Sequence, residues 1–124
     1  MTNVALYLQA QETLTDIIKQ LEPLQTKFEK GSSQYTLLIR RLMAFHLALD
    51  LVKQKNSYTI TPSSYTSAQL QQAIKTISSA LKKTEKIPIK LRHNLTQQQR
   101  LLRQISAYHL ALELIEEALQ TCES

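Results

Sequence analysis

The sequence predicts an all-α fold, an antiparallel four-helix bundle built from two duplicated helical hairpins with pseudo-twofold symmetry. Three observations lead to this prediction. The chain of 124 residues contains one glycine and three prolines, too few turn-forming residues for a sheet protein. Four segments repeat apolar residues with the period of a helix that faces a core. Two stretches, AFHLALDLV at 44–52 and AYHLALELI at 107–115, have nearly the same sequence.

The first helix is expected over residues 4–28. Pro23 lies inside this pattern, and a proline in a helix interior removes a backbone hydrogen bond, so we expect a kink near residues 19–23. Gly31 follows as a C-terminal cap, because glycine accepts the positive φ angle that such caps adopt. The apolar face of this helix consists of Tyr7, Leu14, Ile18, Leu21 and Phe28.

A second helix is expected from Ser32 or Ser33, either of which can act as its N-cap, to about Lys55. A heptad pattern of apolar residues gives this helix one face toward the core. The face consists of Tyr35, Leu38, Leu42, Phe45, Leu49 and Val52. A polar loop that contains Pro62 is expected to follow, over residues 56–66.

Two further helices carry the same N-terminal signal. Thr66 with Gln69, and Thr96 with Gln99, have the spacing of a capping box, in which side chain and backbone exchange two hydrogen bonds. The third helix is expected to stop before Pro88. It buries Leu70, Ile74, Ile77 and Leu81, and the fourth helix buries Leu101, Ile105, Tyr108, Leu112, Ile115 and Leu119.

The two halves of the chain align as repeats. KFEK at 27–30 matches KTEK at 83–86 at a spacing of 56 residues, and the second helices match at a spacing of 63. The seven extra residues fall in the loop around IPIKLRHN, where length changes are tolerated. We therefore expect a single domain over residues 1–124, with repeat 1 at about 4–55, a loop at 56–66 and repeat 2 at about 67–122.

Composition indicates a small soluble protein of a reducing compartment. Cys122 is the one cysteine of the chain, so no internal disulfide can form. The N-terminal residues lack the basic and apolar regions of a signal peptide, and no segment reaches the roughly 18 apolar residues of a membrane span. We therefore expect a cytoplasmic protein without a membrane span.

The second and fourth helices carry a further stripe of small and apolar residues. Small residues at helical spacing let two helices approach closely. We expect these two helices to pack together as a central pair; the alternative is that the stripe forms a homodimer interface. The stripe consists of Ala44, Leu47, Ala48 and Leu51, and of Ala107, Leu110, Ala111 and Leu114.

Each copy of the repeated stretch places a histidine four residues before a carboxylate: His46 before Asp50, and His109 before Glu113. We interpret each pair as an i,i+4 ion pair at the margin of the core. A metal site of two histidines and two carboxylates is the alternative, provided that the two helices face each other. We expect neither a metal nor another cofactor.

A catalytic alternative rests on Arg41 and His46, which form the pattern R-x4-H. This pattern resembles the motif of the HEPN family of helical ribonucleases. The resemblance covers six residues and implies an arginine and a histidine that act together on the 2′-hydroxyl and phosphate of RNA. The second copy departs from the motif, because Gln104 replaces the arginine and Arg103 lies one residue earlier.

The formal charge of +5 is concentrated between residues 71 and 103, where Glu85 is the one acidic residue. Lys75, Lys82 and Lys86 repeat at spacings of seven and four, which places them on one side of the third helix. This pattern predicts a basic stripe, which can be a solvated helix face or can serve an acidic protein surface, a polyanion or an anionic membrane face. Its residues are Lys75, Lys82, Lys83, Lys86, Lys90, Arg92, Arg100 and Arg103.

No glycine-rich phosphate loop and no set of nucleophile, base and orienting residue is present in the sequence. The leading hypothesis is therefore a non-enzymatic helical binding or adaptor protein, of the chaperone, immunity or complex-subunit type, with an acidic protein surface as its partner. The first alternative is an accessory protein of replication or repair that binds nucleic acid through backbone charge. A HEPN-like ribonuclease is the second.

Overall fold

The structure is a computed structural model of the whole chain, and it describes residues 4–56, 65–86 and 95–123. Within these ranges the all-α prediction is confirmed, since the chain forms helices and no strand. No helix in the described ranges is long and apolar enough to cross a membrane. The elements are α1 (Val4–Leu21), the 3-10 helix η1 (Glu22–Thr26), α2 (Ser33–Asn56), α3 (Ser67–Glu85) and α4 (Leu95–Glu123).

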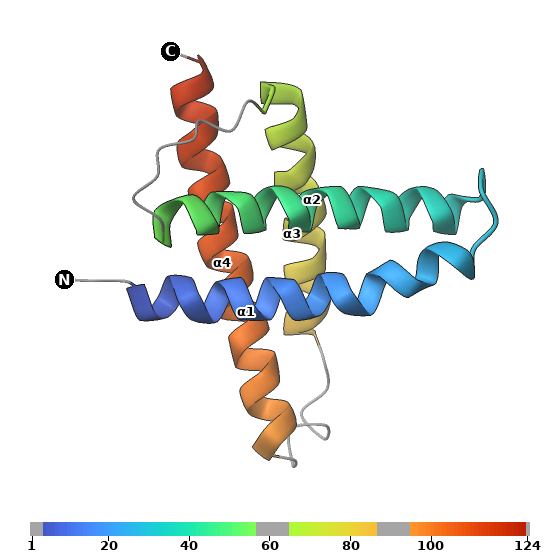
Figure 1. Cartoon of the computed structure of the whole chain (residues 1–124), viewed down its shortest axis with the longest axis horizontal. Coiled ribbons are helices and arrows are strands. Elements are labelled where there is room, and N and C mark those ends of the chain that lie inside the picture. The colour runs from blue at the N-terminus through green and yellow to red at the C-terminus, as the bar shows by residue number, and fades with distance from the viewer. Residues whose placement is uncertain (1–3, 57–64, 87–94, 124) are drawn as a thin grey trace.

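The four α-helices form two antiparallel hairpins that lie crosswise, with α1 and α2 in one layer and α3 and α4 in the other (Figure 1). Helices α2 and α4 each contact the other three α-helices, whereas α1 and α3 do not touch within the described ranges. The two helices that share the repeated stretch are therefore central. The most deeply buried large side chains come from all four helices: Leu14, Val52, Leu70, Ile77 and Ile115.

Pro23 ends the first α-helix. The predicted single helix over residues 4–28 was wrong at its C-terminal end, because α1 stops at Leu21 and the chain continues as η1. Pro23 has no N–H to offer the carbonyl four residues earlier, and its ring would clash with that carbonyl. At the first positions of a new helical turn neither problem arises. The chain therefore changes from α to the tighter 3-10 helix.

The turn between the first two helices agrees with the prediction in the positive φ angle and in the N-cap, but the prediction that Gly31 caps the first helix was wrong, because η1 ends at Thr26 with Lys27 as its C-cap. Gly31 has a φ angle of 91°, which only glycine adopts readily. Ser32 then caps α2, since its Oγ accepts a hydrogen bond from the N–H of Tyr35 at 3.1 Å. The hydroxyl also donates to the carbonyl of Glu29 at 2.7 Å, so the cap and the turn stabilise each other.

One of the two predicted capping boxes is present. The N–H of Gln69 donates to Thr66 Oγ1 at 3.1 Å, and Gln69 Oε1 accepts from the N–H of Thr66 at 3.0 Å. The second prediction was wrong, because α4 already includes Leu95 and Thr96 therefore lies inside the helix. Pro62 and Pro88 lie outside the described residues.

Candidate functional site

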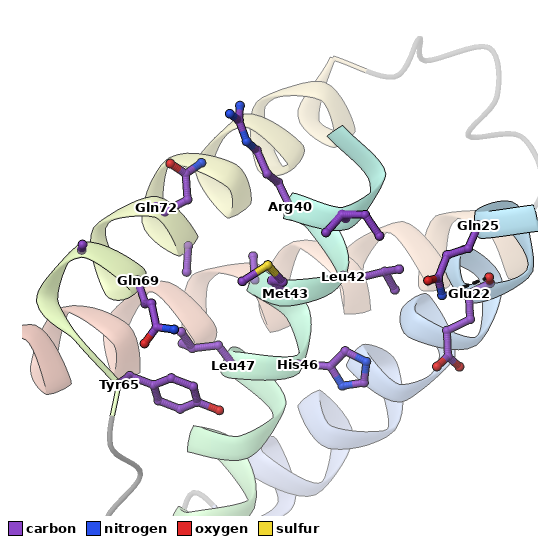
Figure 2. Close-up of a pocket in the computed structure, with 14 residues that line it drawn as sticks. Glu22, Gln25, Arg40, Leu42, Met43, His46, Leu47, Tyr65, Gln69 and Gln72 are labelled. Carbon is purple, nitrogen blue, oxygen red and sulfur yellow. Dashed lines mark hydrogen bonds between the residues drawn. The ribbon is translucent and has the colours of Figure 1, made fainter. Parts of the chain in front are cut away.

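An open groove of about 570 Å³ lies over α2, between η1 on one side and the start of α3 on the other (Figure 2). Apolar side chains form its floor and polar side chains stand along its rim. The lining residues are Glu22, Gln25, Ile39, Arg40, Leu42, Met43, Ala44, His46, Leu47, Tyr65, Ala68, Gln69, Gln72 and Ala73.

Met43 is the exposed apolar centre of this groove. Its side chain is 58% exposed, while its neighbours Leu42 and Ala44 are buried. Figure 2 shows the thioether of Met43 between the labelled groove residues of α3 and those of η1. A flexible, polarisable methionine adapts to apolar partners of different shape. An exposed side chain of this kind at the centre of a concavity is typical of a docking surface.

The two walls of the groove are held in place by local structure. On one side, the 3-10 turn after Pro23 brings Glu22 and Gln25 to the rim. On the other, the capping box fixes the first turn of α3, which carries Gln69. The groove therefore depends on a proline and a cap, two features that are set by the sequence.

Tyr65 ties the start of α3 to α2 at one end of the groove. Its hydroxyl donates a hydrogen bond to Oδ2 of Asp50. Burial of the phenol raises the pKa of Tyr65 to about 12, helped by this hydrogen bond and by the negative charge of Asp50. Tyr65 therefore stays neutral and able to donate at physiological pH.

The structure does not assemble the metal site that the sequence offered as an alternative. No group of three or more His, Cys, Asp or Glu side chains suited to a metal ion occurs in the described ranges. The four candidates, His46, Asp50, His109 and Glu113, are all exposed, and the carboxylate of Asp50 accepts a hydrogen bond from Tyr65. His46 lines the groove instead.

The two residues of the R-x4-H pattern have different surroundings. His46 lines the groove together with Arg40. Arg41 is partly buried, and its positive charge acts on Tyr108. Burial raises the pKa of Tyr108, while a hydrogen bond with Thr84 and the charge of Arg41 oppose that rise. Arg41 does not line the groove that contains His46.

The stripe of small and apolar residues lies inside the molecule. All eight of its members are buried except Leu110, which is partly buried: Ala44, Leu47, Ala48, Leu51, Ala107, Leu110, Ala111 and Leu114. Because side chains of the same chain cover them, this stripe presents little surface to a second copy.

The α3 part of the predicted basic stripe is fully accessible. Lys75, Lys82, Lys83 and Lys86 are exposed, and none of them forms an ion pair or hydrogen bond with another described side chain. Lys90 and Arg92 lie outside the described residues. The three lysines within α3 and Lys86, its C-cap residue, are together called the lysines of α3, and all four are available to a partner.

Arg100 and Arg103 belong to different surroundings. They are exposed on α4 and line a second cleft, of about 420 Å³, between α4 and α1. Two carboxylates of α1, those of Glu12 and Asp16, line the same cleft. Charges of both signs therefore line this cleft, although no ion pair joins them. These two arginines thus share the cleft with negative charges, whereas the lysines of α3 do not line it.

The second cleft is the counterpart of the groove under the repeat alignment. Five of the six residues of helix α1 that line it stand 56 positions before five groove residues at or just before the start of α3, and the sixth, Gln20, has no counterpart in the groove. Arg103 in the cleft likewise stands 63 positions after Arg40 in the groove. The five matched α1 residues are Gln9, Glu12, Thr13, Asp16 and Ile17, and they correspond in order to Tyr65, Ala68, Gln69, Gln72 and Ala73.

The two counterparts differ in chemistry. Glu12 occupies the position of Ala68, and Asp16 that of Gln72, so the cleft carries charge where the groove is apolar or neutral.

The groove was not predicted from the sequence, because its lining comes from three segments that periodicity does not connect. The signal in the sequence was Met43, an apolar residue off the predicted core face.

None of the protein-family models, curated proteins or solved structures with which the chain was compared matches it. Its function is therefore inferred from the groove and from the charged residues around it.

Proposed function

We propose that this chain is a non-enzymatic helical binding protein whose groove over α2 receives apolar side chains of a partner protein. The observation that carries the proposal is the exposure of Met43 at the centre of a groove with an apolar floor and a polar rim. Apolar cores surrounded by polar rims are the usual anatomy of protein interfaces. The role of the chain would then be that of an adaptor or complex subunit.

The polar residues of the groove favour binding over catalysis. His46 is exposed and makes no hydrogen bond to another described residue, so no neighbour orients it as a general base. The amide side chains of Gln25, Gln69 and Gln72 offer hydrogen bonds to a backbone or side chain of a partner.

Methionine labelling provides a direct test. The chain contains two methionines, so a sample with ¹³C-labelled methionine methyl groups gives one signal from the groove, that of Met43. The probe is a synthetic helical peptide of leucine, alanine and glutamine with one apolar face. We expect this peptide to shift the Met43 signal, and we expect Met43→Glu to abolish its binding.

Two variants complete this test. Leu102→Glu makes the same kind of change at a residue that is 66% exposed and outside the groove, and it should leave peptide binding intact. Ala68→Glu introduces a glutamate into the groove at the position that corresponds to Glu12 of the second cleft. This substitution should weaken peptide binding at least tenfold. Equal binding by wild type, Met43→Glu and Ala68→Glu would rule out the groove as the site.

A second candidate function is nucleic-acid binding through backbone charge. The observation in its favour is the row of exposed lysines on α3 without ionic partners among the described residues. Such binding would fall steeply with salt and show little sequence preference. A gel shift with duplex DNA at about 50 mM salt tests it, and Lys82→Glu with Lys83→Glu should remove the shift. Absence of a shift in the wild type would exclude this candidate.

A further inference from the structure

One face of α3 joins the groove to the exposed lysines. Ala68 and Gln72 line the groove, and Lys75, Lys82 and Lys86 follow them at spacings of three, seven and four residues. At about 100° of rotation per residue, these five positions and Lys83 fall within an arc of roughly 100°. The other two groove residues of α3, Gln69 and Ala73, lie about 100° and 140° round the helix from Ala68, so the row of positive charges adjoins the groove on its Ala68 side.

We infer that the groove and the lysines of α3 form one composite site for a partner helix that is apolar at one end and acidic at the other. This inference rests on the proposed function and adds the chemical class of the partner. Charge complementarity selects the occupant, because exposed cations that adjoin an apolar groove favour carboxylates beside apolar side chains. Arg40 of α2 and Glu22 of η1 also line the groove with opposite charges, so the excess of positive charge comes from the lysines.

The dimensions fit a single helix. At a rise of about 1.5 Å per residue, Lys75 lies roughly 10 Å along α3 from Ala68, and Lys86 roughly 27 Å. A partner helix of about 20 residues laid along this face spans both parts. Its apolar turns would pack on Met43 and Ala68, and its acidic turns would face Lys75, Lys82 and Lys86.

Other occupants would use only part of this surface. Nucleic acid would contact the lysines and gain nothing from Met43. A second copy of the chain would seat its own surface in the groove and would make the protein dimeric. The composite site therefore predicts that Met43 and the lysines contribute to the binding of the same molecule.

The experiment uses three fluorescent helical peptides of about 20 residues with the same apolar half. Their other half is rich in glutamate, glutamine or lysine. Binding to the intact chain is measured by anisotropy at low and high salt. We expect the glutamate peptide to bind about tenfold more tightly than the glutamine peptide at low salt, with the advantage shrinking at high salt because the charges are exposed. The lysine peptide should bind most weakly.

Two double variants distinguish a local effect of the lysines of α3 from an effect of the net charge of the protein. Lys75→Glu with Lys82→Glu should remove the advantage of the glutamate peptide. Lys27→Glu with Lys30→Glu makes the same change in net charge at exposed positions outside the groove, and it should preserve that advantage. Circular dichroism checks whether both variants keep their helices.

Each contrary result has a distinct meaning. Equal binding of the glutamate and glutamine peptides, both abolished by Met43→Glu, would overturn the composite site and leave the groove in place. Failure of all three peptides to shift the Met43 methyl signal would overturn the proposed function as well. Lysine-dependent binding of duplex DNA with no peptide binding would assign the surface to nucleic acid. A wild-type dimer that Met43→Glu converts to a monomer would assign the groove to a second copy.

Discussion

Replacing Ile115 by alanine tests the orientation of α4 in the core. Ile115 is 0% exposed, and the substitution removes three of its side-chain carbons. At about 0.8 kcal/mol for each buried carbon, the lost transfer free energy is about 2.4 kcal/mol. The remaining cavity adds about 1 kcal/mol or more, because the surroundings relax only in part. We therefore expect the free energy of unfolding to fall by about 3–4 kcal/mol, a large fraction of the stability of a small domain.

Urea unfolding followed by circular dichroism measures this loss. The matched control is Leu102→Ala, which removes the same number of carbons from the same helix at a side chain that is 66% exposed. Its expected cost is below about 0.5 kcal/mol, as for other surface substitutions. Similar losses from the two variants, or a loss below about 1 kcal/mol for Ile115→Ala, would contradict the burial of this face of α4 in the core.

Three further predictions concern the turn, the cap and the tyrosine that hold the groove. Gly31→Ala should lower the free energy of unfolding by about 1–2 kcal/mol; nothing lies within 4 Å of the added Cβ, so a neutral result would contradict the role of the positive φ angle. Thr66→Ala should cost about 1 kcal/mol in the same assay; no loss would mean that the capping box is dispensable. Ultraviolet titration should show Tyr65 ionising near pH 12, as a transition missing from Tyr65→Phe. Since folding raises this pKa above the ordinary value of 10.0, the stability that it contributes is complete below pH 10 and lost as the pH rises toward 12; ionisation near pH 10 would contradict this.

Local signals in the sequence predicted much of the fold, within limits that two threonines illustrate. Thr66 and Thr96 stand in the same pattern, yet Thr66 caps α3 whereas Thr96 lies inside α4. Inside a helix a threonine hydroxyl can bond to the carbonyl four residues earlier, as Thr13 and Thr15 do. The pattern therefore permits a cap without requiring one. Pro23 shows the opposite case, because its chemistry excludes an α-helix interior.

The candidate site was less accessible to sequence reasoning because its contacts join distant segments. The predicted pairing of His46 with Asp50 assumed that neighbours on one helix meet. The structure gives Asp50 a hydrogen-bond partner fifteen residues away, Tyr65. Lys55 similarly pairs with Glu117 across α2 and α4, at 3.1 Å between Nζ and Oε1. Periodicity identifies the face of a helix, but it does not identify the segment that covers the face.

The proposed repeat alignment also pairs residues that are in contact in the structure. Phe45 and Tyr108 are counterparts under the repeat alignment, and their rings stack at 5.8 Å between centroids and an interplanar angle of 28°. Counterparts meet in this way where a twofold axis passes between two copies. Contacts of α2 with α3, and of α4 with α1, are the other pairs that such an axis relates.

The proposed repeat alignment matches five lining residues of one cleft with five of the other, and the two linings differ in charge. The fold supplies two concave surfaces at the crossings of its hairpins. Around one, Glu12 and Asp16 of α1 and Arg100 and Arg103 of α4 line the same cleft, so that charges of both signs lie there without a direct ion pair. Around the other, Ala68 and Met43 leave an apolar surface beside exposed lysines. A cleft that holds charges of both signs favours no single charge in a ligand, whereas exposed apolar surface beside charges of one sign gains free energy when an acidic, apolar partner covers it. The asymmetry between related surfaces, more than the volume of either, supports the groove over α2 as the binding site.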